Sequence, residues 1–256
     1  MQAQPCHLGG LGVLVTRPAH QADALCELIE RAHGRPIRFP ALEITPSADA
    51  EAARAILAAP NDLLVFVSAN AAEHGFALLP DSLPAALDIA AVGRATAAKL
   101  EALGLEPTLV PETGFDSEAL LELPELAAPH GRRVVIVRGN DGRSLLGDTL
   151  RERGAEVAYA EVYRRGIPRR SPDNLLRGWA RMVDVVTASS NAVLDNLFTM
   201  LGDDGAERVR NTPLVVVSRR MADHARELRC RDLHLAASAH DTDVLAALCA
   251  LRSGYG

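Results

Sequence analysis

The sequence predicts an α/β fold of two doubly wound parallel-sheet domains, because its second half repeats the pattern of its first. VLVTR at 13–17 returns 121 residues later as VVIVR at 134–138. LVFVSANAA, which begins at Leu64, returns at the same spacing, and a third block, which begins at Ile89, returns after about 125 residues. Because the repeated positions lie where strands end and helices begin, we expect a ligand cleft between the two copies.

Short apolar runs mark the expected strands. They lie near 11–16, 36–40, 63–67, 88–92 and 107–110 in the first half, and near 132–137, 155–159, 184–187, 213–217 and 233–235 in the second. Continuous apolar runs are typical of parallel strands that are buried on both faces. Helical patterns such as 21–33 and 145–153 lie between them, and five strands in each half indicate a flavodoxin-like unit used twice.

Two segments interrupt this alternation at matching places in the repeat. One is 41–45, which follows Pro40, and the other is 160–166, which precedes Pro168. Each has strand-like alternation and a nearby proline, so each is a candidate connection between the domains. The repeat alone would divide the chain near residue 125.

Composition limits the classes of function. The 256 residues are 48% hydrophobic and 23% charged, which is typical of a globular protein with a sizeable core. The net charge of −6 argues against general nucleic-acid binding, whereas arginines that gather at strand ends favour a small anionic ligand.

The four cysteines show no paired spacing, and Cys26 and Cys249 occupy apolar helix positions, so we expect reduced thiols. The sequence has neither a secretion-like leader nor an apolar run of membrane-spanning length, and we expect a soluble cytoplasmic protein.

Several common sites are missing from the sequence. It has no P-loop pattern, and Gly9, Gly10 and Gly12 precede the first strand instead of following it. Its histidines are scattered without metal-ligand spacing, and no serine lies in a GxSxG pattern. We therefore expect neither a metal, nor a cofactor, nor a covalent nucleophile.

Small polar turns follow the expected strands instead. They lie at 16–18, 68–70, 93–96, 139–143, 189–191 and 218–220. Each turn offers backbone N–H groups, a hydroxyl or amide, and the positive end of a helix. A single such turn is explained by ordinary helix capping. Six turns with interspersed arginines predict a surface that binds several carboxylates or phosphates.

A set of motifs resembles one known family along essentially the whole chain. They are VLVTRP (13–18), FVSANA (66–71), AAVGRATAAKLEALG (90–104), GFDSEAL (114–120), GRRVVIVRGNDGRSLLGDTLRERGAEV (131–157), VYRR (162–165) and TASSNAVLDNL (187–197). Their order and spacing resemble the uroporphyrinogen-III synthase family.

The resemblance implies a lyase of haem biosynthesis that needs neither metal nor cofactor. Such an enzyme closes the linear octacarboxylate hydroxymethylbilane to uroporphyrinogen III, with loss of water and inversion of ring D through a spiro intermediate. The resemblance also implies that the bilane-producing deaminase hands over the substrate to this protein. The protein itself is expected to be a monomer with no nucleic-acid or membrane partner. The resemblance further implies nested domains, in which 1–39 joins 167–256 and the other domain is 40–166, linked by paired strands near 41–45 and 160–166.

The resemblance implies that Tyr163 assists departure of the hydroxyl as an acid, with packing as the alternative role, while Tyr159 is expected in the core. The expected substrate-binding residues come from the turns and are Arg17, Ser68, Asn70, Gly93, Thr96, Arg138, Gly139, Asn140, Arg143, Ser189, Ser190, Ser218 and Arg219. Met221 stands where the internal repeat has Thr96 and cannot supply its hydroxyl.

Two other classes of function stay open at this point. A non-catalytic binding protein for a polycarboxylate would use the same fold and the same turns. A nucleotide-dependent transferase would also use doubly wound domains, but the first turn lacks the glycines that such an enzyme needs.

Overall fold

The chain divides into two compact units in the computed structural model, which describes residues 6–114, 116–140, 142 and 144–254. One unit contains the chain up to Glu43 together with the chain from Gly166 onward, and the other is Ile44–Arg165. The predicted site residue Arg143 lies outside the described residues. Each unit is described by itself below.

The first unit contains a five-stranded sheet in which every strand pairs in parallel with its neighbours. Its strands are β1 (Gly12–Val15), β2 (Arg35–Arg38), β8 (Val185–Ala188), β9 (Leu214–Val216) and β10 (Leu233–Leu235), in the spatial order β10-β9-β8-β1-β2. Renumbered along the unit, this is the flavodoxin-like order 2-1-3-4-5. The fully buried residues of β1 and β8 explain their continuously apolar sequences.

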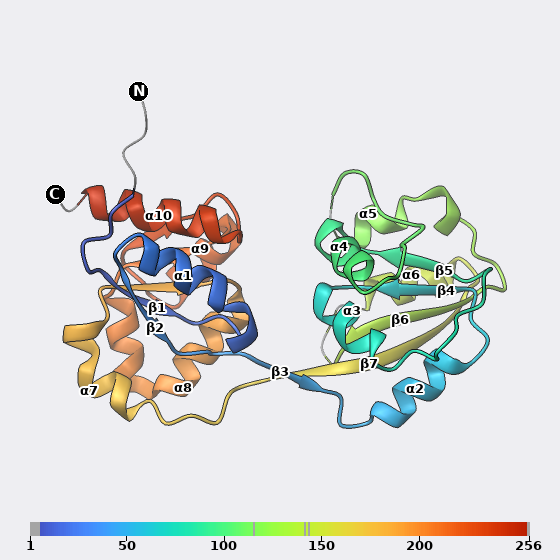
Figure 1. Cartoon of the computed structure of the whole chain (residues 1–256), viewed down its shortest axis with the longest axis horizontal. Helices are drawn as coiled ribbons and strands as arrows, with labels where there is room; N and C mark the ends of the chain where they lie inside the picture. Colours follow the sequence, from blue (N-terminus) through green and yellow to red (C-terminus); the bar gives the residue numbers. More distant parts are fainter. Residues whose placement is uncertain (1–5, 115, 141, 143, 255–256) are drawn as a thin grey trace. The chain divides into compact units, whose positions relative to one another are not determined.

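Helices cover both faces of this sheet (Figure 1). They are α1 (Asp23–Arg31), α7 (Asp173–Met182), α8 (Asn191–Arg210), α9 (Arg219–Glu227) and α10 (Asp241–Gly254), with a short 3-10 turn η1 (Ala19–Gln21) before α1. Val13 and Val15 pack with α1 and α10, whereas Leu14 packs with the other three helices. Alternate residues of one strand therefore supply two separate cores.

The second unit contains a five-stranded sheet with the spatial order β3-β7-β6-β4-β5. The strands are β3 (Glu43–Pro46), β4 (Leu63–Phe66), β5 (Asp88–Ala91), β6 (Arg133–Gly139) and β7 (Glu156–Gly166). The pairs β4–β5, β4–β6 and β6–β7 are parallel. The surrounding helices are α2 (Ala50–Ala58), α3 (Ala69–Phe76), α4 (Arg94–Ala102), α5 (Ser117–Leu121), the 3-10 turn η2 (Pro124–Leu126) and α6 (Leu145–Glu152). The two sheets, in which parallel pairs dominate, confirm the predicted α/β fold class.

One expected strand is almost absent, and the two segments outside the strand–helix alternation both take part in the second sheet. The expected strand at 107–110 is reduced to one parallel bridge, Ala90 to Leu109. The segment after Pro40 becomes β3, which pairs with β7 and completes the sheet from its far edge. The segment 160–166 continues β7 beyond β6, so the long strand serves both the sheet and the chain connection.

The expectation that all four cysteines are reduced is wrong in the structure. Cys6 and Cys249 form a disulfide, with their Cα atoms 5.7 Å apart, which ties the first described residue to α10. Sequence spacing could not reveal this pair, because the two cysteines are 243 residues apart. Cys26 and Cys230 are free and buried, and burial raises the pKa of both thiols, that of Cys230 to about 11. Among the described residues, no helix combines the length and apolar character needed to cross a bilayer.

Candidate functional site

Each sheet has one point at which the chain reverses its direction of winding, and four of the six predicted turns, at 16–18, 68–70, 139–143 and 189–191, lie there. In the first unit this switch lies between β1 and β8, and in the second it lies between β4 and β6. Open α/β sheets bind ligands outside the carboxyl ends of the strands at such a switch. The carboxyl ends lead into Arg17 and Ser189 in one unit, and into Ser68 and Arg138 in the other.

Two buried threonines join β1 to β8 at the switch of the first unit. The Thr16 hydroxyl donates to the Thr187 carbonyl at 2.6 Å, and the Thr187 hydroxyl donates to the Leu14 carbonyl at 3.0 Å. These reciprocal bonds satisfy both buried hydroxyls and fix the spacing of the two strand ends. Thr187 is not among the site residues predicted from the sequence, although its place two residues before Ser189 could have indicated it.

Arg17 is engaged by α10. Its guanidinium forms an ion pair with Asp241 and donates to the Ala239 carbonyl at 2.8 Å, and its side chain is only 12% exposed. A ligand carboxylate would therefore compete with Asp241 for this charge. Asp116, which is the counterpart of Asp241 in the internal repeat, caps α5 instead, by accepting from the Ala119 N–H at 2.9 Å.

Three of the predicted serines cap helices. Ser68, Ser190 and Ser218 each accept a hydrogen bond from the backbone N–H three residues later, at 3.1, 3.2 and 3.2 Å. The capping alternative is therefore real for all three. A capping hydroxyl still keeps its own O–H donor, so capping and ligand binding are compatible. Gly93 is the N-cap of α4, and Thr96 is buried in the first turn of that helix.

Tyr163 lies at the switch of the second unit. Its side chain is 1% exposed and packs in the core that faces α3 and α4. The phenol oxygen lies 3.4 Å from the Ser68 hydroxyl and accepts from the Arg165 guanidinium at 3.3 Å. The ring of His74 lies 5.7 Å away. The phenol is thus held between a hydroxyl and a cation, and the sequence analysis did not single out Arg165.

A bulge in β7 brings Tyr163 to this position. Arg138 pairs with Glu161, but the next residue of β6, Gly139, pairs with Tyr163. One extra residue in β7 reverses the alternation of its side chains. Tyr159 therefore packs with one core of the unit and Tyr163 with the other, although they are four residues apart. Tyr159 is half-buried and packs against the core that faces α5 and α6, as expected, whereas Tyr163 is the more deeply buried of the two.

The end of β6 packs against the ring of Tyr163 and is hydrogen-bonded to its backbone. A Cβ atom at Gly139 would stand 2.6 Å from two ring carbons of Tyr163, so only glycine fits there. The Asn140 N–H donates to the Tyr163 carbonyl at 3.0 Å, and the Asn140 side-chain oxygen accepts from the Arg165 N–H at 2.8 Å. Asn140 therefore fixes the bulged strand end as well as lying beside the predicted site.

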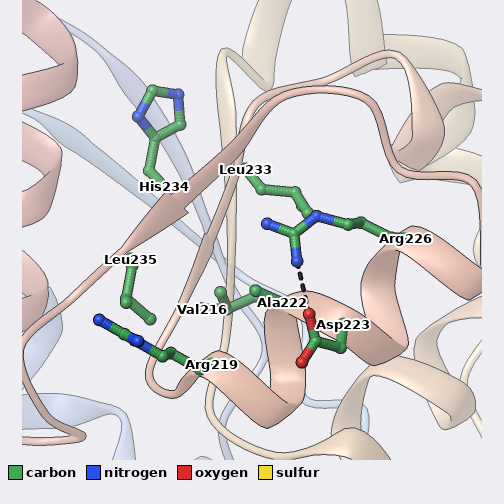
Figure 2. Close-up of a pocket in the computed structure, with 8 residues that line it drawn as sticks. All are labelled: Val216, Arg219, Ala222, Asp223, Arg226, Leu233, His234 and Leu235. Atoms are coloured by element: carbon green, nitrogen blue, oxygen red, sulfur yellow. Dashed lines mark hydrogen bonds and ion pairs between the residues drawn. The ribbon is translucent and has the colours of Figure 1, made fainter.

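Arg138 points away from Tyr163 toward a small pocket of about 110 Å³. Its guanidinium donates to the carbonyls of Gly139 and Gly142, both at 3.1 Å, and lies 5.0 Å from the ring centre of Tyr159. The pocket is lined by Val67, Ser117, Ile136, Arg138, Gly142, Leu146 and Tyr159. Asn70 lies in the first turn of α3, and Arg219 lines a different pocket beside β10 (Figure 2).

The site offers hydroxyl, amide and guanidinium groups and one phenol. Among the described residues, no group of three or more His, Cys, Asp or Glu side chains is arranged to hold a metal. The available chemistry is hydrogen bonding, charge neutralisation and proton donation at the phenol.

A protein-family model described as Uroporphyrinogen-III synthase HemD matches residues 23–246, which includes parts of both units and five of the six predicted turns, all but that at 16–18. The chain belongs to the uroporphyrinogen-III synthase family. Uroporphyrinogen-III synthase of Escherichia coli (strain K12) is 34% identical over 249 residues, which is 93% of this chain and 100% of the relative. The protein of the same name from Salmonella typhimurium (strain LT2) is 33% identical over 93% of this chain and 100% of the relative.

Solved structures of the family share the fold. A mutant uroporphyrinogen III synthase from the extremely thermophilic bacterium Thermus thermophilus gives a TM-score of 0.66 at 21% identity, covering 96% of this chain and 98% of that chain. The enzyme from Helicobacter pylori 26695 gives 0.57 at 16% identity, covering 84% and 92%. At these identities the likeness concerns the fold alone.

Proposed function

We propose that this protein is a cyclising lyase that converts hydroxymethylbilane to uroporphyrinogen III. The family match carries this proposal, because it spans 23–246 and so includes five of the six predicted turns, with members in both units. Relatives that carry the synthase name are aligned over their whole length. No observation favours a non-catalytic binding protein or a nucleotide-dependent transferase.

The reaction depends more on control of the substrate's conformation than on strong acid, base or nucleophilic groups. Loss of the hydroxyl from ring A, as water, leaves an electron-poor azafulvene. Ring D then attacks through its substituted carbon, and the spiro intermediate fragments and recloses with ring D inverted. Closure without an enzyme uses the free carbon and gives the non-inverted isomer. The enzyme must therefore hold a flexible chain in one conformation, which is catalysis by positioning and electrostatics.

The turns are suited to holding carboxylates. Backbone N–H groups at helix starts and charge-assisted bonds from arginines are the usual partners of such groups. We assign this role to the turn residues at the carboxyl ends of β1, β4, β5, β6, β8 and β9. Arg17 attracts a ligand carboxylate less strongly than an unpaired arginine would, because Asp241 already neutralises its charge.

Tyr163 is the proposed acid for departure of the hydroxyl. The Arg165 guanidinium donates to its phenol oxygen, so the phenol proton is directed to another acceptor. After that proton leaves, the same guanidinium stabilises the negative oxygen that remains. The bulge, Gly139 and Asn140 hold this geometry from the backbone side.

The short lifetime of hydroxymethylbilane also affects how this substrate reaches the enzyme. Because hydroxymethylbilane closes by itself to the wrong isomer, we propose that it passes directly from the bilane-producing deaminase to this enzyme. That transfer would keep the time in free solution short.

A coupled assay tests the proposal. The protein is mixed with a bilane-producing deaminase and its substrate, and the two product isomers are separated and measured. We expect uroporphyrinogen III to dominate, whereas omission of the protein should leave the non-inverted isomer. An unchanged isomer ratio with correctly folded protein would reject the assignment.

A further inference from the structure

A pocket beside the edge strand of the first unit lies outside the two switch points. It has a volume of about 270 Å³ and is formed by α9 on one side and the ends of β9 and β10 on the other (Figure 2). Its lining residues are Val216, Arg219, Ala222, Asp223, Arg226, Leu233, His234 and Leu235. Nothing in the reaction described above uses its inner end.

The pocket joins an apolar floor to a charged wall. Val216 and Ala222 are buried, and Leu235 is 49% exposed, which is unusual for a leucine and leaves apolar surface open to a ligand. Arg219 and Arg226 are seven residues apart on α9, two turns or about 10 Å along the same face. Figure 2 shows them toward opposite ends of the pocket, with Asp223 between them.

The charges of the wall favour an anion. Asp223 pairs with Arg226 at 2.6 Å, and both side chains of this pair are more than 60% exposed. Exposed pairs of this kind are weak and exchange readily with other partners. Arg219 adds a second positive charge, so the three wall residues carry a net charge of +1. A carboxylate can therefore compete with Asp223 for Arg226 while Arg219 binds another.

The pocket is continuous with the carboxyl end of the sheet. Arg219 directly follows the cap Ser218, and Leu235 ends β10, so the outer end of the pocket is the turn after β9. Arg226 and Leu233 lie at the inner end, farther from that turn. A ligand held at the turn can extend one part of itself along α9.

We propose that this pocket binds one pyrrole ring of the linear substrate, with the ring on the apolar floor and its two acid arms on Arg219 and Arg226. Pockets for drug-sized ligands begin at about 300 Å³, so this pocket matches one substituted ring and not the four-ring chain. The ring's origin in hydroxymethylbilane rests on the proposed function. The preference for a flat ring with two carboxylates rests on the pocket alone.

Titration with a single pyrrole ring that carries one acetate and one propionate arm tests the pocket. We expect wild-type protein to bind this probe with a Kd on the order of 1 mM. Arg219→Ala and Arg226→Ala should each weaken binding about five- to tenfold. Asp223→Asn should strengthen it severalfold, because it removes a negative charge and frees Arg226. Arg208→Ala, an exposed change on α8 outside the pocket, is the matched control and should leave binding unchanged.

A second pair of variants separates charge from packing. Leu235→Asp and Leu235→Asn have nearly the same shape, so a larger loss of probe binding in the aspartate variant reports repulsion of the ligand's carboxylates. Leu235 is half exposed, and both variants should fold. Equal binding by these two variants, or no gain with Asp223→Asn, overturns the proposal.

Turnover of hydroxymethylbilane then tests the ring's origin. We expect Arg226→Ala to raise KM about fivefold or more, with kcat much less affected, and Arg208→Ala to leave both unchanged. An unchanged KM in Arg226→Ala overturns the assignment to the substrate, even where the single-ring probe binds. A wild-type protein that does not alter the isomer ratio rejects the proposed function itself, and probe binding then reports only a pyrrole-acid site.

Discussion

Tyr163 is the residue whose chemistry the proposed reaction needs most, because its phenol is the proposed proton donor. Tyr163→Phe keeps the buried ring and removes only the hydroxyl, whose two contacts are long at 3.3 and 3.4 Å. We expect kcat to fall about ten- to a thousandfold, with the remaining product still of type III. The thermal midpoint should change little, which separates lost chemistry from lost packing. Wild-type turnover in this variant would leave Tyr163 with a packing role only.

Gly139 should be as important as Tyr163 for turnover. A Cβ at this position would stand 2.6 Å from the ring, so Gly139→Ala must displace Tyr163. We expect kcat to fall to about the level of Tyr163→Phe, and the double variant to lose little more, because both changes remove one phenol. Kinetics of the two single variants and the double variant check this. Independent, multiplying losses would contradict a shared cause.

Residue roles were the least predictable part of the site. Sequence motifs identified Ser68, Tyr163 and Gly139 as neighbours of the site, and the structure brings these three together. They could not reveal the single-residue bulge of β7, because a bulge is defined by the pairing of β7 with β6, and that pairing cannot be read from local sequence. The motifs therefore did not show that Tyr163 is the more deeply buried of the two tyrosines.

The elements themselves were largely predictable, since buried parallel strands have continuous apolar runs. Nine of the ten expected strands have a counterpart in the structure. The run at 107–110 looked equally apolar but forms only one bridge, at Leu109. The edge of the second sheet is completed instead by β3, whose position depends on β7. Local sequence cannot predict which distant segment pairs at the edge of a sheet.

The disulfide should stabilise the attachment of α10. Reduction of Cys6–Cys249 should lower the thermal midpoint, and Cys249→Ser should reproduce the reduced value and lose any response to reductant. Calorimetry with and without reductant checks this. An unchanged midpoint in both tests would show that the bond contributes nothing to stability.

The free thiols give an independent test of the disulfide assignment. Burial raises the pKa of Cys26 and Cys230, that of Cys230 to about 11, so both stay protonated near pH 8 and react slowly. We expect no alkylation of the folded protein, two labels after unfolding without reductant, and four after reduction. Four labels without reductant would restore the fully reduced state that the sequence suggested.

At the scale of the whole molecule, the nested division of the chain makes a prediction about folding. The segment 40–166 contains the complete second sheet and two cores of its own. We propose that it is a domain, and we expect it to fold alone with a cooperative thermal transition. The internal repeat would instead divide the chain near residue 125. A fragment of residues 1–125 would lack β6 and β7 and should not fold. Circular dichroism of both fragments decides between the two divisions.

The shared grip on an octacarboxylate is the physical claim on which the proposed function depends most. It is tested by titrating uroporphyrinogen III into wild-type protein and variants over a range of salt concentrations. We expect affinity to fall with salt, and Arg138→Ala to cost about 1–3 kcal/mol. Arg17→Ala should cost less, because Asp241 already forms an ion pair with Arg17. Ser68→Leu should cost more, because it also blocks backbone N–H groups at the start of α3. Affinity that ignores salt, or one arginine that accounts for nearly all of it, would contradict a grip shared among the turns.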